Sequence, residues 1–398
     1  MNKIGTINHK NILFLQGPMG NFFKTMDVSF RKRGANTFKI GFNAGDQFFS
    51  NRDNYIPYRG KKKEWGNFIH HFLIAHKIDK VFLFGDCRFY QRITLQVSIE
   101  LNIDIFVFEE GYIRPDFITM ERYGVNDFSH IPRDNNFYKE LDTTQLKETE
   151  ILDAQAKFYR RGWSATTYFI LRDLFWFNYP HYEHHSQHNF IVEAFFGIRN
   201  ALRKYKYKIT EKGLLAKILD KHKDNYYFVP LQTYNDFQII EHSDFSSIEV
   251  FIEECMHSFA KFAPGHTQLI IKHHPMDRGR KNYIQFINDL SQKLNIKERV
   301  ITVHDLHLPT CLKNAIGTIT INSTVGISSL YHHTPTITLG NAIYDIDGLT
   351  CKDMLLDDFW EGYKRPDEEL FEKFRRYLID QTQLNGSFYG RFPDELNL

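Results

Sequence analysis

The sequence predicts an α/β protein with two Rossmann-like domains that face a central cleft. Its 398 residues exceed the length at which a single hydrophobic core usually stops growing, so two domains are expected. Short apolar runs alternate with longer amphipathic stretches, and this pattern restarts after a middle region. Continuous apolar strands separated by helices are typical of parallel βαβ units. Ligands of such sheets bind beyond the carboxyl ends of the strands.

The first half of the chain carries the first set of predicted elements. Two stretches have helical length, residues 64–76 and 88–101. The apolar runs predicted to be buried strands are residues 11–17, 37–43, 80–86 and 104–111.

The second half repeats the arrangement, and we place the division between the domains after residue 215. Helices are predicted at residues 246–262, 281–294 and 325–332. The predicted strands are residues 226–233, 268–274, 300–304, 317–321 and 334–339. The second domain is residues 216–398, and its polar tail, 380–398, is expected to be loosely ordered.

A helical region rich in aromatic and basic residues, about 142–215, closes the first domain, which spans residues 1–215. Within it, residues 190–208 mix Phe195, Ile198 and Leu202 with Arg203 and several lysines. This pattern fits a connector that packs on both domains. It equally fits a basic amphipathic helix at an anionic membrane surface, and the sequence leaves both open.

Composition excludes several classes of protein. Lysine and arginine total 50 against 48 acids, which gives a net charge of +2 and no electrostatic argument for a nucleic-acid partner. The four cysteines are widely spaced and form no CxxC pair, which favours a reducing cytoplasm. No stretch of ~18 apolar residues occurs. We therefore expect a cytoplasmic protein, soluble or peripheral on a membrane.

Two strand ends carry the residues best suited to chemistry. Glu109 and Glu110 close an apolar run, and strand alternation sends their side chains to opposite faces. Either carboxylate could act as a general base or as a nucleophile. In the second half, Lys272 and His273 precede His274 and Pro275, and the proline restrains His274 to extended backbone. An imidazole there can donate a hydrogen bond to a phosphate oxygen.

Three further turns complete the candidate site. Ser323 and Thr324 lie with Gly326 between a strand and a helix, where backbone N–H groups can bind phosphate or serve simply as a cap. Near the N-terminus, Gly17-Pro18 and Asp86-Cys87-Arg88 follow two strands. Gly17 allows close backbone approach to a ligand, and Asp86 and Arg88 could orient hydroxyl or carboxylate groups of a sugar, although each segment also fits a plain turn.

No cofactor is expected from the motifs. The glycine loop lacks the spacings of dinucleotide and ATP sites. The histidines at 181, 184, 185 and 188 lie near Glu183, but no HExxH motif occurs, so we predict no metal site.

Together these segments resemble the capsule polysaccharide synthesis and export family, in its shorter branch with a single β-Kdo transferase module. The resemblance covers about residues 11–350. It is carried by Gln16-Gly17-Pro18, Gly85-Asp86-Cys87-Arg88, Glu109-Glu110-Gly111-Tyr112-Ile113-Arg114-Pro115, Val229-Pro230-Leu231-Gln232, His274-Pro275 and Asn322-Ser323-Thr324-Val325-Gly326.

The resemblance implies a GT-B fold and a metal-independent transfer of Kdo from CMP-Kdo to phosphatidylglycerol or lysophosphatidylglycerol. The product would start the poly-Kdo linker of a capsule, at the inner face of the cytoplasmic membrane, with other capsule biosynthesis and export proteins as possible partners. The C-terminal domain would bind the CMP-sugar and the N-terminal domain the acceptor.

The resemblance also implies roles for single residues. Glu110 is the first candidate for the catalytic carboxylate, ahead of Glu109, and His274 contacts the phosphate. Related enzymes often have Asp where Glu110 stands, which leaves nucleophile and base open for it, and often have His where Gln91 stands. The nucleotide site would comprise Lys272, His274, Pro275, Ser323, Thr324 and Gly326, and donor or acceptor contacts would come from Gly17, Pro18, Asp86, Arg88, Arg114 and Gln232.

Three other functions fit the same residues. A sialyltransferase-like enzyme would differ only in its CMP-sugar. A non-enzymatic adaptor of capsule export would need neither Glu110 nor His274, and an epimerase on the same scaffold would bind a UDP-sugar.

Overall fold

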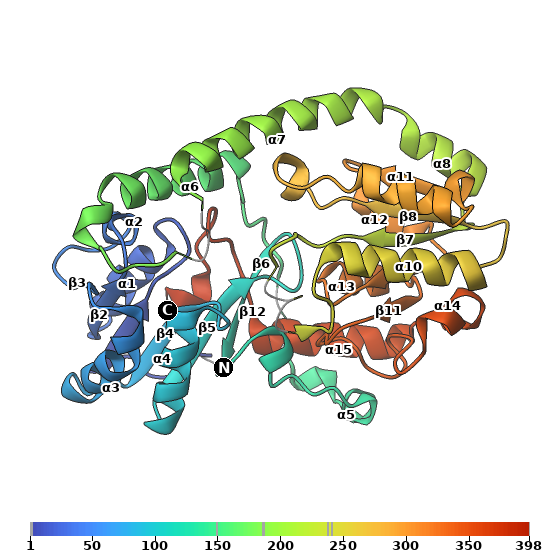
Figure 1. Ribbon diagram of the computed structural model, residues 1–398. Coiled ribbons are helices and arrows are strands. Elements are labelled where there is room, and N and C mark those ends of the chain that lie inside the picture. The colour runs from blue at the N-terminus through green and yellow to red at the C-terminus, as the bar shows by residue number, and fades with distance from the viewer. Residues whose placement is uncertain (1–2, 149, 185–187, 237–238, 240–241, 398) are drawn as a thin grey trace. The chain divides into compact units, whose positions relative to one another are not determined.

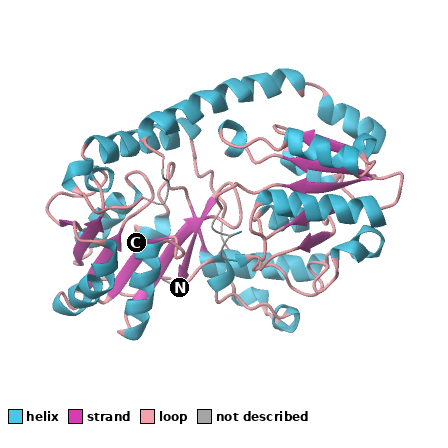
Figure 2. Cartoon of the chain, viewed as in Figure 1, coloured by secondary structure: helices cyan, strands magenta, loops and turns pink. Residues whose placement is uncertain are grey.

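The computed structural model describes residues 3–148, 150–184, 188–236, 239 and 242–397 (Figures 1 and 2). The chain forms two compact units, which are described separately. Unit 1 comprises Met1–His130, Leu146–Ala194 and Tyr377–Leu398, and unit 2 comprises Ile131–Gln145 and Phe195–Arg376. The sequence prediction drew one division after residue 215. In the structure, residues 195–215 and 131–145 belong to unit 2, and the C-terminal segment belongs to unit 1.

The sheet of unit 1 has the strand order of a Rossmann fold at its centre. Within the described residues it contains seven strands in the order β12-β6-β5-β4-β1-β2-β3. The strands from β5 to β3 are parallel, whereas β6 pairs antiparallel with β5 and β12 antiparallel with β6. Their bounds are β1 Asn11–Leu15, β2 Asn36–Gly41, β3 Tyr55–Pro57, β4 Lys80–Phe84, β5 Asp104–Glu110, β6 Phe117–Arg122 and β12 Gln383–Asn385.

Each face of this sheet is covered by its own hydrophobic core, which explains why the strands read as unbroken apolar runs. Phe14, Phe82 and Phe106 lie on one face, where their aromatic rings contact one another. Leu13, Val81 and other aliphatic residues lie on the opposite face. The helices and 3₁₀ turns of this unit include α1 Phe22–Lys32, α2 Ala44–Phe48, α3 Trp65–Ala75, α4 Phe89–Glu100 and α6 Phe158–Leu174.

The sheet of unit 2 is wholly parallel and repeats the same order. Its five strands among the described residues run β11-β10-β7-β8-β9. If the strands are numbered within the unit, the order read from the β9 edge is again 3-2-1-4-5. The order in which successive strands are added reverses between β7 and β10, although all five strands run in the same direction. The bounds are β7 Tyr226–Pro230, β8 Gln268–Lys272, β9 Val300–Val303, β10 Gly317–Thr320 and β11 Thr336–Thr338.

Apolar side chains again cover both faces of this second sheet. The helices of this unit, including two that it shares with unit 1, have the bounds α5 Asn135–Glu140, α7 Phe190–Thr210, α8 Leu214–His222, α10 Ile248–Phe262, α11 Ile284–Lys293, α12 Leu308–Lys313, α13 Val325–Tyr331, α14 Leu356–Gly362 and α15 Glu368–Thr382. Helix α7 begins in unit 1 and continues into unit 2, and α15 ends in unit 1. No helix in the described part of the chain is long and apolar enough to cross a membrane.

The predicted α/β class with two parallel-dominated sheets is confirmed. All nine predicted strands form, and strands β3, β6 and β12 are additional. The expectation of a loosely ordered tail is wrong, because β12 pairs with β6 and Leu384, Phe388 and Leu396 are buried in the core of unit 1. The tail is short and polar on average, so its few anchoring residues gave no periodic signal.

Candidate active site

Three of the predicted motifs of unit 1 lie at the carboxyl ends of adjacent strands. Strand β4 pairs with β1 on one side and with β5 on the other, and all three run in the same direction. Gln16-Gly17 follows β1, Gly85-Asp86 follows β4, and β5 ends with Glu109 and Glu110. The topology therefore brings these motifs to one edge of the sheet, where ligands of this fold bind.

Glu109 is an acidic residue of these motifs whose pKa is strongly changed by its surroundings. Its side chain is partly buried, and withdrawal from water raises the pKa of the carboxyl to about 7. The backbone N–H of Glu110 donates to its Oε1 at 3.0 Å, and the charges of Glu110 and Asp86 also act on it, opposed by Arg88. A carboxyl that titrates near neutral pH can both release and accept a proton under cellular conditions.

Glu110 lies in a different environment. Its carboxylate is 37% exposed, and its Oε1 lies 3.7 Å from a guanidinium nitrogen of Arg161 on α6. The Arg161 guanidinium also lies over the ring of Tyr389 at 5.8 Å. Glu110 is thus an accessible carboxylate beside a cation, next in sequence to a proton-carrying one.

The hairpin that follows the two acids is closely fitted. Strand β5 pairs with β6 through Glu109 and Glu110 themselves, so both acids lie within the ladder and not in a loop. A Cβ on Gly111 would come within 2.1 Å of the Phe117 carbonyl oxygen, which explains the glycine. The Tyr112 N–H donates to Gln383 of β12, and Arg114 donates to the Gly111 carbonyl. The position of the acids therefore depends on β6 and β12.

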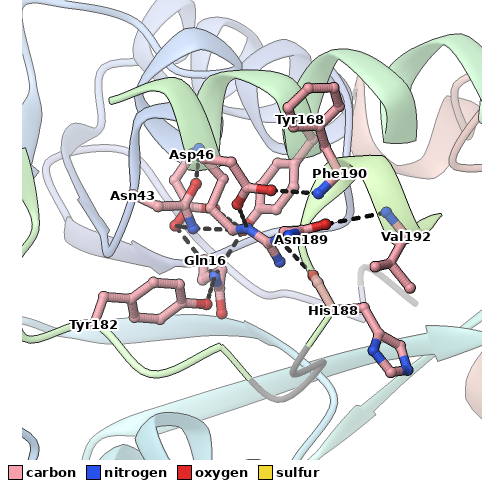
Figure 3. Close-up of polar contacts among 11 residues, drawn as sticks. Gln16, Asn43, Asp46, Tyr168, Tyr182, His188, Asn189, Phe190 and Val192 are labelled. Carbon is pink, nitrogen blue, oxygen red and sulfur yellow. Dashed lines mark hydrogen bonds and ion pairs between the residues drawn. The ribbon is translucent and has the colours of Figure 1, made fainter. Parts of the chain in front are cut away.

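The carboxyl end of β1 is occupied by a buried polar network (Figure 3). The side-chain amide of Gln16 donates to Asp46, Tyr168 and Tyr182, each at 3.1 Å. Asn43 donates to the Tyr168 hydroxyl at 2.6 Å, and the pKa of the Asp46 carboxyl is raised by burial. Since Tyr168 belongs to α6, this network holds that helix against α2 and β1.

Most of the residues predicted to contact a ligand at the ends of β1 and β4 make contacts within the protein that account for their residue types. A Cβ on Gly17 would lie 2.7 Å from the ring of Phe23, and Pro18 is buried. Asp86 is buried and accepts from the Val125 N–H and the Cys87 thiol. Arg88 is partly exposed, with its guanidinium 5.9 Å from the Phe84 ring centroid. A contact of these residues with a sugar stays a prediction.

Gln91 belongs to the same network, although the sequence assigned it no role. It is buried on α4 and its amide donates to Gln16 Oε1 at 3.2 Å. It therefore helps to orient Gln16.

In unit 2, the backbone fixes the proton position on His274. The Met276 N–H donates to His274 Nδ1 at 3.2 Å, so the neutral ring carries its proton on Nε2. His274 is partly exposed and Pro275 is exposed. His273 is buried, and burial together with His304 lowers its pKa to about 3, so its ring is neutral at physiological pH. Lys272 is buried as well, which lowers its pKa.

Ser323 and Thr324 follow β10, and β7 lies between them and the His274 loop in the sheet. The Val325 N–H donates to Ser323 Oγ at 3.2 Å, and both residues are partly exposed. A Cβ on Gly326 would lie 2.1 Å from the Tyr344 hydroxyl oxygen. Gln232 is buried beneath this edge, where its amide donates to Asn322 at 3.0 Å.

One feature of unit 2 was missed from sequence: the inner face of α7 holds the loop that follows His274. Arg199 donates to the carbonyls of Gly279 and Arg280, and Arg203 donates to that of Arg278. The ring of Tyr207 stacks on His304 at 3.6 Å. These contacts are long-range, and no local spacing could reveal them.

The next link joins the end of α7 to the His273 ring. Glu211, directly after α7, accepts from His304 Nδ1 at 2.6 Å, and His304 stacks on His273 at 4.5 Å. A continuous set of contacts therefore runs from α7 to the residue that precedes His274.

Two other regions of unit 1 are the histidine-rich segment around Tyr182 and a cavity. The rings of His184 and Tyr182 are 5.9 Å apart, and His185 lies outside the described residues. Among the residues that are described, no group of three or more His, Cys, Asp or Glu could hold a metal ion. A cavity of about 550 Å³ lined by Arg31, Asn36 and Tyr55 lies at the amino ends of β2 and β3, at the edge opposite the motifs.

The sequence profile of the family described as "Capsule polysaccharide biosynthesis protein" matches residues 79–389. The chain belongs to this family. It is 38% identical to the "Capsule polysaccharide export protein KpsS" of Escherichia coli, over 96% of this chain and 98% of that protein. It is 36% identical to the "Capsule polysaccharide modification protein LipB" of Neisseria meningitidis serogroup A, over 97% and 94%.

Among solved structures, the "beta Kdo 2,7 transferase" of Thermosulfurimonas dismutans KpsC aligns over 92% of this chain and 89% of its own, at 12% identity and a TM-score of 0.42. The UDP co-structure of MnaA from S. aureus aligns over 97% and 94%, at 9% identity and a TM-score of 0.32. Scores of this size do not establish a common fold.

Proposed function

We propose that this protein is a metal-independent glycosyltransferase of the GT-B type that transfers Kdo from CMP-Kdo to phosphatidylglycerol or lysophosphatidylglycerol. The transfer would start the poly-Kdo linker of a capsule. Membership of the capsule family and the motifs shared with β-Kdo transferases support the substrates. The observation that carries the chemistry is the pair of adjacent carboxyls, one accessible beside Arg161 and one with a pKa of about 7.

The two carboxyls suit the two steps of a transfer that keeps the β configuration. In the first, Glu110 attacks the anomeric carbon while the bond from that carbon to the phosphate oxygen breaks, and CMP leaves with the bonding electrons. In the second, the acceptor hydroxyl attacks the same carbon and displaces Glu110. Glu109, in its carboxylate form, would take the hydroxyl proton through a water molecule, because its side chain leaves the strand on the face opposite Glu110. Two inversions at one carbon restore the starting configuration.

His274 would act on the departing phosphate. The Met276 N–H donates to Nδ1, so the neutral ring carries its proton on Nε2, and a hydrogen bond from Nε2 to the leaving oxygen would stabilise the charge that develops there. Pro275, Lys272 and the Ser323-Thr324-Gly326 turn would complete the nucleotide site, with Gly17, Pro18, Asp86, Arg88, Arg114 and Gln232 as further proposed contacts. Lys272 is buried at the strand end, and this burial lowers its pKa below the usual value.

The acceptor is a lipid, so the enzyme would work at the cytoplasmic face of the inner membrane as a peripheral protein. Other capsule biosynthesis and export proteins would be its partners. No cofactor enters this mechanism.

A mass-spectrometric assay tests the proposal. Purified full-length protein is incubated with short-chain lysophosphatidylglycerol and either CMP-Kdo or CMP-sialic acid, and transfer from CMP-Kdo alone is expected. Product only with CMP-sialic acid would show a sialyltransferase-like enzyme. Binding of UDP but not CMP in calorimetry would favour an epimerase.

A second candidate, a non-enzymatic export adaptor, is favoured by the name "export protein" of the E. coli relative. It predicts that a cell whose only copy carries Glu110→Gln or His274→Ala still makes capsule. The transferase proposal predicts loss of capsule from folded protein in both cases, and capsule retained in both variants would decide for the adaptor.

A further inference from the structure

Helix α7 presents an apolar stripe with regular spacing on its outer side. Phe195, Ile198, Leu202, Tyr205 and Ile209 are each 57–68% exposed. They are separated by alternating steps of three and four residues, so they lie on one face of the helix. Over 14 residue steps the stripe is about 20 Å long. An exposed row of this kind marks a surface that another body covers.

The rest of unit 2 fixes this face outward. On the inner side of α7, Arg199 and Arg203 donate to backbone carbonyls of residues 278–280, and Tyr207 is buried against His304. Rotation of the helix about its axis to bury the stripe would break these contacts. The helix, visible as the long light-green element in Figure 1, is therefore held with its apolar side away from the sheet of its own unit.

The charge of the helix decides what covers the stripe. From residue 195 to 210 there are five cations and no Asp or Glu: Arg199, Arg203, Lys204, Lys206 and Lys208. The three lysines are exposed, and Lys206 and Lys208 flank the stripe, one on each side. A second copy of α7 would bring a second set of five cations beside the first, whereas an anionic lipid surface is attracted to them. Lysine stems can also lie along the apolar boundary with their ammonium groups at the headgroups.

We propose that the outer face of α7, formed by Phe195, Ile198, Leu202, Tyr205 and Ile209 with Lys206 and Lys208 beside them, docks on an anionic phospholipid bilayer. The helix lies in the plane of the interface. This inference rests on the proposed function only for the reason to visit a membrane. Because α7 contacts the loop that follows His274, the docked helix would also hold the proposed phosphate-binding residue near the membrane.

Vesicle co-sedimentation of the full chain tests the docking. Wild-type protein is expected to bind vesicles of phosphatidylcholine with phosphatidylglycerol at least tenfold more tightly than phosphatidylcholine alone, and 0.5 M salt should weaken the binding. Leu202→Ser with Ile198→Ser should lose at least tenfold in affinity. The matched control is Leu355→Ser, which changes an equally exposed leucine outside α7 in the same unit. Lys206→Glu with Lys208→Glu should give the same loss without touching the apolar row.

Melting temperatures of all variants within a few degrees of wild type show that folding is kept. Equal binding to neutral and anionic vesicles, or no binding to either, would overturn the proposal. So would a wild-type dimer in sedimentation equilibrium that Leu202→Ser dissociates, because the second copy would then be the occupant.

Activity separates this proposal from the proposed function. With a monomeric short-chain acceptor the Leu202→Ser variant should transfer Kdo as wild type does, and with the acceptor embedded in vesicles it should fail. Wild-type protein that binds anionic vesicles but makes no product from CMP-Kdo would contradict the proposed function and leave the docking face standing.

Discussion

In unit 1 the carboxyl end of β1 is filled by side chains from a distant helix, whereas in unit 2 the equivalent strand β7 ends in a small amide bridge. Gln16 bonds to Asp46, Tyr168 and Tyr182 below α6. Among the described residues, the Gln232 amide donates to Asn322 of the β10 end at 3.0 Å and to Asp236 at 3.4 Å. We call the buried network around Gln16 the plug of unit 1, and the Gln232–Asn322 hydrogen bond the bridge of unit 2. The two arrangements stand at the same topological position.

The difference fits the roles that we propose for the two units. In unit 1 the plug fills the β1 end, and the proposed function assigns the catalysis to Glu109 and Glu110 at the end of β5. In unit 2, the partly exposed groups lie on both sides of the bridge, at His274 and at Ser323 and Thr324. Two Rossmann-like sheets of identical strand order therefore offer different surfaces, one acidic and one suited to phosphate.

The largest effect expected is on the acidic side. Glu110→Gln removes the proposed nucleophile without changing its size, and kcat should fall at least a thousandfold, about 4 kcal/mol in barrier. His274→Ala should raise the KM for CMP-Kdo about tenfold and also lower kcat, because it removes the proposed hydrogen-bond donor to the leaving phosphate. Steady-state kinetics with both substrates measures the contrast. Equal losses of kcat/KM with kcat preserved in both variants would contradict the division of roles.

A second prediction concerns how the acids are held. Gly111→Ala forces a Cβ to within 2.1 Å of the Phe117 carbonyl, and the β5–β6 hairpin must shift, at a cost of ~3 kcal/mol in the free energy of unfolding. Gly162→Ala in α6 is the matched control, because nothing lies within 4 Å of its added Cβ. That change should stabilise by ~0.5–1 kcal/mol. Urea denaturation measures both, and equal stability of the two variants would show that the hairpin tolerates displacement.

The third prediction uses the titration of Glu109. Its pKa of about 7 in the folded chain is above the usual 4.5, so the folded state holds more protons between these values. The contribution of this carboxyl to stability therefore decreases as the pH rises from about 4.5 to about 7. Glu109→Gln removes this pH-dependent term, and the variant should gain ~1–3 kcal/mol relative to wild type between pH 5 and pH 8.

Activity should have the opposite dependence on pH. If Glu109 accepts the acceptor proton, wild-type kcat rises through about pH 7, while Glu109→Gln has a low and flat profile. Parallel stability curves for the two proteins from pH 5 to 8 would show that Glu109 does not titrate in this range.

The strands and their ends could be predicted from sequence because burial on both faces leaves an unmistakable apolar run. Alternation also predicts that Glu109 and Glu110 point to different faces, which their different surroundings fit. Strand β6 escaped detection because Phe117–Arg122 mixes polar and apolar residues on a sheet with two buried faces. Strand β12 has three residues, two of them polar, and its identity depends on a partner more than 260 positions away.

Tertiary contacts account for what the site prediction left out. The raised pKa of Glu109 comes from burial, which no motif encodes, and Arg161 reaches Glu110 only because Tyr168 anchors α6 at the β1 end. The sequence identified glycines that the structure requires, but it could not tell whether a ligand or a packed side chain requires them. Gly17 was predicted to allow close approach of a ligand and Gly326 to belong to a phosphate-binding turn, yet each is also required by an aromatic ring packed against it.

The smallest effect expected is at Arg161, and it probes how the plugged edge of unit 1 serves the acidic one. Its contact with Glu110 is long, at 3.7 Å, and both side chains are well exposed, so Arg161→Met should change the free energy of unfolding by less than about 1 kcal/mol. Its effect on kcat should be larger than on stability, about threefold to tenfold, because the guanidinium orients a carboxylate that must approach the anomeric carbon. Arg160→Met, at the preceding exposed position, is the matched control and should leave kcat unchanged. If the two variants have the same kcat, the charge of Arg161 does not contribute to the proposed role of Glu110. Helix α6, which the plug anchors at the β1 end, would then affect Glu110 through packing alone.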